Sequence, residues 1–350
     1  MQTFRPVQLI LIWMLCVMWN VQSVADTKPI EWRMSSAFPG SALQLGTLGR
    51  EIARNITDIS DNRLKVAFIE PNVIERPFRL FDAVSKDKLE AAWATPSYWF
   101  QKDPAFALFS SVPFGPDPLE FTAWMSYGGG AALRDELYEP HGLISIVCGA
   151  MAPEAGGWFR REIRQIEDFR GLKMRAFCLG AQVLQKLGMN PQLIAHDKLH
   201  TALQDGSLDA AEFSMPAIDT NLRFDQVGQL YYYFPGWHQQ TTLFELLISQ
   251  SAWLALPRAQ QAQVRTACAA NLARGIAQGE ALQARAILDI RERGTEIRKF
   301  PPQVLNGLEK AWLEVAAELS AKSKNFARIW AAQTRFREEY RVWRELGYLR

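Results

Sequence analysis

The chain has 350 residues, with 39 Lys and Arg against 37 Asp and Glu and a formal net charge of +2 at pH 7. A charge this balanced argues against nucleic acid or an anionic membrane surface as the main partner. About 325 residues follow the N-terminal segment described next, which is more than one hydrophobic core usually organises, so two lobes are expected.

Residues 1–25 are typical of an export signal. Arg5 is their one charged residue, and an apolar run from about Val7 to Trp19 leads to Ser23-Val24-Ala25. Small residues there suit signal peptidase, so we predict cleavage after Ala25 and export to the periplasm. An uncleaved anchor is the alternative. Bulky residues before Cys16 argue against a lipoprotein, and no later stretch is long enough to cross a bilayer.

Strand-like and helix-like patterns then alternate along the chain. Ser41 can cap the first helix, and Gly188 and Gly206 end two later ones. Such alternation predicts an α/β fold with parallel, doubly wound sheets. In chain order, the expected elements are strand 31–37, helix 41–56, strand 64–69, helix 78–84, strands 89–94 and 107–112, helix 133–138, strands 143–148 and 173–177, helices 182–187 and 200–205, and strand 209–213.

After Trp253 the sequence becomes rich in Ala, Gln, Arg and Leu, which predicts a long helix over 257–293 and more helix over 301–319 and 325–343. No linker or repeat marks a boundary, as expected for lobes joined by several chain crossings. The predicted division is signal peptide 1–25, lobe one 26–145 with a returning segment near 230–255, lobe two 146–229 with helical parts of 256–300, and a C-terminal helical region 301–350.

Three cysteines remain after the export signal, Cys148, Cys178 and Cys268. An odd number at wide spacings is neither a disulfide framework nor a metal motif. An exported chain makes a Cys148–Cys178 bridge conceivable, but buried free thiols are the favoured interpretation.

Motifs of catalysis and of nucleotide binding are missing: there is no GxSxG, HExxH, GxxxxGK[ST] or strand-linked GxGxxG. His196 and His200 have the i, i+4 spacing of a zinc pair, but no third ligand is evident. A surface helix is the favoured interpretation of that pair, and no enzyme is predicted.

Four segments combine aromatic and polar side chains: 156–160, 173–175, 212–216 and 231–238. Their polar members stand at or just beyond the C-terminal ends of predicted strands, the edge where open α/β sheets bind ligands. Arg175 offers a planar fork of donors suited to a carboxylate. The alternative is a structural ion pair, for example with Glu212.

These segments resemble the solute-binding subunits of tripartite ATP-independent periplasmic (TRAP) transporters, above all the branch that binds 2-oxoacids such as pyruvate. The resemblance covers nearly the whole exported chain. The similar motifs, in order, are residues 81–84, 96–99, 112–115, 128–130, 135–138, 156–159, 171–175, 209–212 and 232–238.

The resemblance implies a two-lobed, periplasmic-binding-protein-like clamp with a parallel-rich sheet in each lobe and a long helix spanning both. It implies a receptor that captures a small carboxylate, a 2-oxoacid or related monocarboxylate, for the membrane subunits of a TRAP transporter. Arg175 would grip the carboxylate, inside an aromatic pocket drawn from Trp32, Tyr98, Trp99 and Phe213. An exported lyase or isomerase, with Glu154 or Glu212 as base, is the alternative.

The resemblance also implies Na⁺ or Ca²⁺ bridging ligand and protein, and no organic cofactor. The family's ligands are a Gln, a main-chain carbonyl and a Glu; the corresponding positions here are Glu154, Phe213 and Gln239. One carboxylate and one carboxamide are thus kept but exchanged, which preserves the charge of an oxygen site. The alternative is loss of the metal through unconnected drift.

Some members of that branch form dimers through their C-terminal helices. Apolar and aromatic side chains here would suit such an interface or, equally, the core. They are Phe326, Ile329, Trp330, Phe336, Tyr340 and Trp343.

Overall fold

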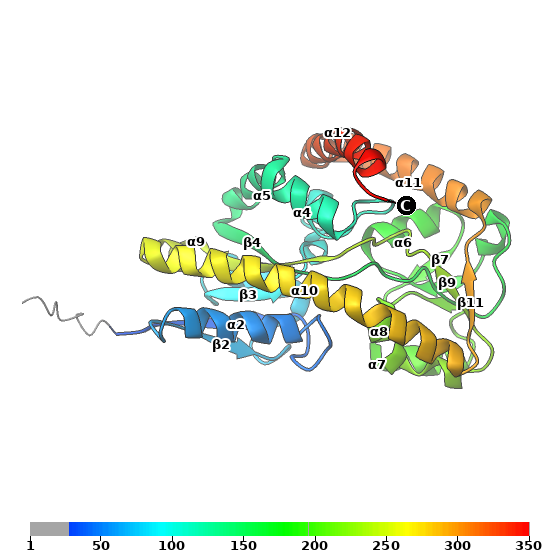
Figure 1. Ribbon diagram of the computed structural model, residues 1–350, viewed down its shortest axis with the longest axis horizontal. Helices are drawn as coiled ribbons and strands as arrows, with labels where there is room; N and C mark the ends of the chain where they lie inside the picture. The colour runs from blue at the N-terminus through cyan, green and yellow to red at the C-terminus, as the bar shows by residue number, and fades with distance from the viewer. Residues whose placement is uncertain (1–27, 195, 350) are drawn as a thin grey trace, which may run out of the picture.

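A computed structural model describes residues 28–194 and 196–349 (Figure 1). The predicted export signal, residues 1–25, lies outside the described residues. Within the described ranges, no helix combines the length and apolar character that a membrane crossing requires. The chain forms two sheets in two lobes, with helices around both.

The first lobe contains a five-stranded sheet in the order β2-β1-β3-β10-β4. β1 runs parallel to β2 and β3, while β10 returns antiparallel between β3 and β4. Every residue of β3 and β10 is buried, so this sheet is the centre of the lobe's core. The strands are Ile30–Ser36 (β1), Leu64–Ile69 (β2), Ala91–Ala94 (β3), Leu143–Ala150 (β4) and Leu243–Ser249 (β10).

Short helices cover this sheet and connect its strands. The α-helices are Thr47–Ile59 (α2), Leu80–Ser85 (α3), Pro118–Tyr127 (α4), Gly130–Tyr138 (α5) and Gln250–Leu254 (α9). The 3₁₀ helices are Pro77–Arg79 (η1), Pro96–Trp99 (η2), Pro104–Phe109 (η3) and Glu139–His141 (η4).

The second lobe contains a six-stranded sheet in the order β11-β9-β5-β8-β6-β7. β6 is parallel to β7 and β8, and β9 to β11, whereas β5 is antiparallel to both its neighbours. The strands are Gly157–Phe159 (β5), Lys173–Arg175 (β6), Asn190–Gln192 (β7), Ala210–Ala211 (β8), Tyr231–Phe234 (β9) and Glu296–Lys299 (β11). The helices are Cys178–Lys186 (α6), His196–Gln204 (α7), Pro216–Asp219 (α8), and the 3₁₀ turns Ile166–Phe169 (η5), Thr220–Leu222 (η6) and Phe224–Gln226 (η7).

The α/β class is confirmed, with three corrections. Both sheets are mixed, because β5 and β10 run against their neighbours. The predicted strand 107–112 is wrong, since Pro104–Phe109 is a buried 3₁₀ helix that begins where the Asp103 side chain accepts a hydrogen bond from the amide of Ala105. A short buried apolar run has no periodicity that separates strand from helix. The helix predicted from Ser41 begins only at Thr47.

The predicted long helix is confirmed as α10, Arg258–Glu292, with 35 residues and a length of about 52 Å. Figure 1 shows it crossing the molecule along both lobes, and it packs against α2 and β4 at one end and α8 at the other. Gly275 and Gly279 permit this approach. A Cβ at these positions would lie 2.8 Å from the carbonyl oxygen of Ala150 and 2.9 Å from the amide of Ala152.

A disulfide joins Cys148 on β4 to Cys268 on α10, with their Cα atoms 4.1 Å apart. Both the conceivable Cys148–Cys178 bridge and the favoured set of free thiols are therefore wrong. Among the cysteines of the described residues, Cys178 is the free one. The pairing depends on α10 lying directly over β4. The neighbouring Asn271 amide donates to the carbonyl oxygens of Cys148 and Leu48 at the same contact.

Two further helices, Pro302–Lys322 (α11) and Lys324–Leu346 (α12), form a hairpin over both lobes (Figure 1). α11 packs against α6, and α12 against η3, α4 and α5. Of the side chains considered for a dimer interface, Phe326 and Ile329 are buried in the core. Trp330 packs on Trp312, Phe336 stacks on Tyr340, and Trp343 is 57% exposed. The residue boundaries given above for the lobes stay a prediction.

Candidate ligand site between the lobes

Arg175 and Glu212 meet at the carboxyl ends of neighbouring parallel strands. β6 and β8 pair with Arg175 opposite Ala211, so Glu212 follows directly beside the arginine. The Arg175 Nη1 donates to the main-chain oxygen of Glu212 at 2.6 Å and to its Oε2 at 3.0 Å. Their side chains are 13% and 6% exposed. The ion pair proposed as the alternative role of Arg175 is thus present, in the place expected for a ligand.

Glu154 and His238 reach the same point from two loops. The loop after β4 carries Glu154, and its amide donates to the carbonyl oxygen of Gln239 at 3.1 Å. Gly236 lets the two loops touch, because a Cβ there would lie 2.1 Å from the Glu154 carbonyl oxygen. The Nε2 of His238 lies 3.4 Å from Oε2 of Glu154 and 3.5 Å from Oε1 of Glu212. All three side chains are buried.

The charges of this cluster perturb one another. Burial, with help from the Glu212 charge, raises the pKa of Glu154 to about 7, against the opposing effect of His238. Burial lowers the pKa of His238, but its interactions with the nearby Glu154 and Glu212 carboxylates outweigh burial and raise that pKa to about 9. Burial likewise works against ionisation of Glu212, yet Arg175 and His238 hold its pKa below the usual value. Perturbed groups gathered at one point are typical of a functional site.

Several polar atoms here are buried without a hydrogen-bond partner. They include Nε of Arg175, Oε2 of Glu154 and Nε2 of His238. Ser214 Oγ and Asp219 Oδ1, in the segment that follows β8, share this condition. The other carboxylate oxygen of Asp219 accepts from Trp158 and Tyr232. Because buried polar atoms nearly always have partners, such a group indicates a place for a bound polar molecule or ion.

The aromatic residues predicted for the pocket divide into two groups. The Arg175 guanidinium lies 5.2 Å from the ring centre of Phe213. The Tyr98 ring meets Phe177 of the second lobe edge-on, with centroids 5.7 Å apart, and the charge of Arg175 acts on its hydroxyl. Trp32 and Trp99 instead lie in the first-lobe core, where the Trp99 indole donates to Glu245 at 2.6 Å.

Of the side chains predicted for a cation, Glu154 lies in the cluster, whereas the Gln239 amide donates to Thr242 at 2.8 Å. The structure places His238 and Glu212 beside Glu154, and one ligand atom from each of these three lies within 4.8 Å of the others. The sequence analysis assigned His238 no role, although His238 ends the aromatic and polar segment 231–238. Of the rejected His196–His200 pair, the side chain of His196 lies outside the described residues.

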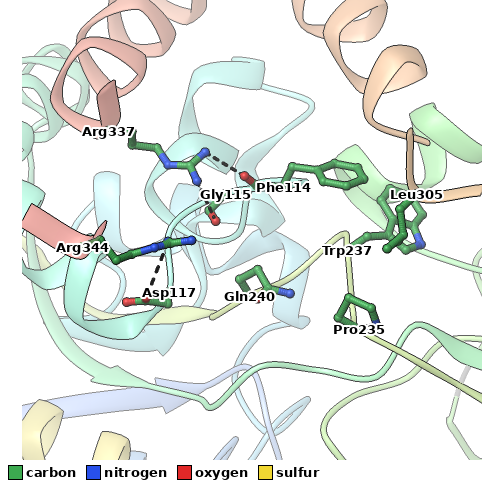
Figure 2. Close-up of a pocket in the computed structure, with 9 residues that line it drawn as sticks. All are labelled: Phe114, Gly115, Asp117, Pro235, Trp237, Gln240, Leu305, Arg337 and Arg344. Carbon is green, nitrogen blue, oxygen red and sulfur yellow. Dashed lines mark hydrogen bonds and ion pairs between the residues drawn. The ribbon is translucent and has the colours of Figure 1, made fainter. Parts of the chain in front are cut away.

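A separate cavity of about 340 Å³ lies between the lobes and the C-terminal hairpin (Figure 2). Its arginines are already engaged. Arg337 donates to the carbonyl oxygens of Phe114 and Gly115, and Arg344 lies 3.9 Å from Asp117. The cavity is lined by residues from the loop before α4, the segment after β9, α11 and α12, and not by Arg175, Glu154, Glu212 or His238. Because both arginines already contact protein oxygens, the cavity is a gap between packed elements and not a carboxylate site.

Comparison with known proteins identifies relatives that match most of the chain. The family model of the bacterial extracellular solute-binding proteins, family 7 (DctP), matches residues 35–323. The monocarboxylate 2-oxoacid-binding periplasmic protein all3028 of Nostoc sp. (strain PCC 7120) is 30% identical over 338 residues, covering 95% of this chain and 92% of that protein.

Two solved structures have the same fold and 30% identity. A TRAP transporter solute-binding protein of Bordetella bronchiseptica RB50 aligns with a TM-score of 0.86 over 91% of this chain and 95% of that one. It is a dimer of mixed occupancy, with calcium and picolinate in one active site and the other site empty. A TRAP solute-binding protein of Pseudoalteromonas atlantica T6c, with bound sodium and pyruvate, aligns with a TM-score of 0.84 over 90% of this chain and 96% of that one.

Proposed function

Because the chain belongs to family 7 of the bacterial extracellular solute-binding proteins, we propose that it captures a small 2-oxoacid or related monocarboxylate for a TRAP-type transporter. The family consists of periplasmic binding receptors, so the chain is a receptor and not an enzyme. The export signal at residues 1–25 and delivery to this transporter's membrane subunits belong to the proposal.

The observation that carries the ligand class is the unpaired Nε of the buried Arg175. Its Nη1 is held by Glu212, which orients the guanidinium and leaves the Nε edge unused. A ligand carboxylate at that edge would form charge-assisted hydrogen bonds away from water. The Phe213 and Tyr98 rings beside Arg175 would limit the size of the attached group.

Entry of a ligand requires the lobes to separate, because the cluster is buried in the described structure. Several contacts cross between the lobes near the site. The Tyr98 ring meets Phe177, and the Cys178 thiol donates to the carbonyl oxygen of Ser97 at 3.9 Å. The amide of Phe114 donates to the carbonyl oxygen of Trp237 at 2.6 Å. These contacts fit a clamp that opens for the ligand and closes over it.

A Na⁺ or Ca²⁺ ion bridging ligand and protein forms part of the proposal, since the two solved relatives contain calcium or sodium. Oε2 of Glu154, which has no hydrogen-bond partner and lies 3.4 Å from Nε2 of His238, suits such an ion. The Phe213 carbonyl and the Gln239 side chain would supply further oxygens, and Gln239 would then give up its bond to Thr242. The ion's role would be to neutralise Glu154 beside the ligand carboxylate.

Assembly into a homodimer is also proposed, as in the Bordetella relative. The end of α12 presents apolar side chains, with Val342, Trp343 and Leu346 all more than half exposed. A second copy would cover them. Sedimentation of the purified chain decides this point: a monomer at micromolar concentration would contradict the dimer and leave the ligand site untouched.

Calorimetric titration with pyruvate, longer 2-oxoacids and dicarboxylates tests the ligand class, with Na⁺ and Ca²⁺ varied. We expect saturable binding of one monocarboxylate per chain. NMR spectra of the same mixtures separate a receptor, which leaves its ligand unchanged, from a lyase or isomerase. Binding of none of these acids would overturn the proposed function.

A further inference from the structure

We propose that Phe78 is a specificity-determining residue of this receptor, and that its ring limits the chain length of the acid that the closed site accepts. The role of Phe78 rests on the proposed function, because that function places the ligand carboxylate at Arg175. It adds a limit at the outer end of the site, at a residue for which the sequence pattern predicted only the start of a helix.

The local sequence holds Phe78 in place. It lies between β2 and α3, at the centre of the 3₁₀ turn η1. Pro77 occupies the first position of this turn, and Arg76 before it is extended, as residues that precede proline prefer to be. The turn leads directly into α3, which contacts β3 and β10 and buries Leu80 and Phe81. Phe78 is therefore anchored, although it is itself 49% exposed.

Three rings from both lobes meet beside this turn. The Phe78 ring centre lies 4.6 Å from that of Tyr98 and 6.2 Å from that of Phe177. Tyr98 and Phe177 meet edge-on, with centroids 5.7 Å apart. Tilted and edge-on contacts at such distances are favourable for aromatic pairs. We call Phe78, Tyr98 and Phe177 the aromatic bridge, because its first two members belong to the first lobe and its third to the second.

The aromatic bridge lies next to Arg175. Phe177 follows Arg175 by two residues at the end of β6. Burial raises the pKa of Tyr98 to about 12, and the nearby charge of Arg175 opposes this rise. The exposed fraction falls from 49% at Phe78, through the half-buried Tyr98 and Phe177, to 13% at the Arg175 side chain. The bridge therefore covers the arginine, and Phe78 is its outermost ring.

The opposite side of Arg175 is unsuited to an apolar chain. Glu212 is bonded to the Nη1 of the arginine, and Glu154 and His238 are buried beside Glu212. Methylene groups placed among these side chains would deprive charged groups of polar partners, which is unfavourable. The aromatic bridge offers apolar contact instead. The chain of a 2-oxoacid held at Arg175 would therefore extend toward the bridge and end at Phe78.

Phe78 is the member of the aromatic bridge that can be removed with the least disturbance. Tyr98 also packs on Phe38 within the first lobe, with centroids 5.6 Å apart, so its loss would affect that packing. Phe177 supplies the second lobe's part of the bridge. Loss of the exposed Phe78 ring would instead open the outer end of the site. A chain that is too long for the closed site could then pass into solvent.

Calorimetry on the exported chain, residues 26–350, tests this role with pyruvate, 2-oxopentanoate and 2-oxooctanoate in one buffer that contains Na⁺ and Ca²⁺. Phe78→Ala should lower the Kd of 2-oxooctanoate relative to that of pyruvate by at least about tenfold, the discrimination that apolar pockets achieve over small differences in chain length. Ile74→Ala is the matched control, because Ile74 precedes η1 in the same loop and is 43% exposed. It should leave the ratio unchanged.

A second variant changes the site in the opposite direction. The larger ring of Phe78→Trp should weaken 2-oxopentanoate binding more than pyruvate binding. It also decides the question if Phe78→Ala does not fold, which circular dichroism would show. Equal weakening of all three acids would mean that Phe78 only holds the lobes together, and would overturn the proposal.

The same titrations keep this role apart from the proposed function. Pyruvate binding by the wild type, with the ratio of Kd values unchanged in both Phe78 variants, removes the role of Phe78 and leaves the receptor. If the wild type binds none of the three acids, both the role of Phe78 and the proposed ligand class are wrong.

Discussion

The Nη1 of Arg175 lies 3.0 Å from Oε2 of Glu212, while the Nε of the same guanidinium has no hydrogen-bond partner. The arginine is therefore both a structural ion-pair member and a donor with an unused edge. The two roles proposed for it from sequence are compatible, because the fork geometry of the guanidinium lets it serve two carboxylates at once.

Replacing Arg175 should separate these roles. A charge-assisted hydrogen bond is worth about 1.5–3 kcal/mol, so Arg175→Ala should weaken monocarboxylate binding at least about tenfold. Arg175→Lys should keep only part of the wild-type affinity, since the lysine ammonium is a point charge without the planar fork of donors. Calorimetry measures the affinity of each variant for the monocarboxylate, and Arg170→Ala, at an exposed position, is the control. Wild-type affinity in the alanine variant would make Arg175 purely structural.

The exchanged pair, Glu154 and Gln239, can be examined by a double-mutant cycle. The main chains of the two residues are hydrogen-bonded, so their side chains are close enough to couple. Glu154→Gln should raise the Na⁺ or Ca²⁺ concentration needed for ligand binding. The double variant Glu154→Gln, Gln239→Glu should bind better than the sum of the singles by about 0.5–3 kcal/mol. Strict additivity, or binding independent of any cation, would mean that the two positions share no ion.

Ligand binding should make the molecule more compact in solution. The site is buried, and Tyr98 and Phe177 bring the lobes together near it, so the free protein has to open to admit a ligand. Small-angle scattering should show a smaller radius of gyration at saturating ligand than without ligand. A scattering curve that does not change on saturation would contradict the clamp.

The disulfide should contribute strongly to stability. It closes a loop of 120 residues, for which the loss of chain entropy in the unfolded state corresponds to about 3–5 kcal/mol. Cys268→Ser should lower the free energy of unfolding in urea by that amount. Cys178→Ala, which keeps the disulfide, is the control. In denaturant without reductant the exported chain should expose one reactive thiol, and three thiols there would contradict the bridge.

A buried carboxyl in the first lobe should make stability depend on pH. Glu245 accepts hydrogen bonds from Trp99 at 2.6 Å and Ser145 at 2.5 Å, yet burial still raises its pKa above the usual 4.5. Because the folded-state pKa is raised, the contribution of the protonated Glu245 to the free energy of unfolding is complete below about pH 4.5 and is lost as the pH rises through the folded-state pKa. We therefore compare the free energy of unfolding of Glu245→Gln with that of the wild type at two pH values. The difference should favour the variant more at pH 8 than at pH 5. A difference that is the same at both pH values would show that Glu245 keeps an ordinary pKa.

The sequence by itself determined the α/β class, the long helix and the receptor family. Each of these depends on patterns within neighbouring residues: alternating strands and helices, an Ala- and Gln-rich run after Pro257, and short motifs in a fixed order. The Lys-Met-Arg motif likewise singled out Arg175, because its position at the end of a predicted strand is a local property.

Only the tertiary structure decided how distant residues meet. Cys148 and Cys268 are separated by 120 positions, and nothing in their local sequence indicates that α10 lies over β4. The same holds for His238, which reaches Glu154 because Gly236 allows two loops to touch. It also holds for Trp99, which lies in the first-lobe core and donates to Glu245 there instead of lining the ligand site. Such pairings depend on the packing of whole elements, which no pattern of adjacent residues encodes.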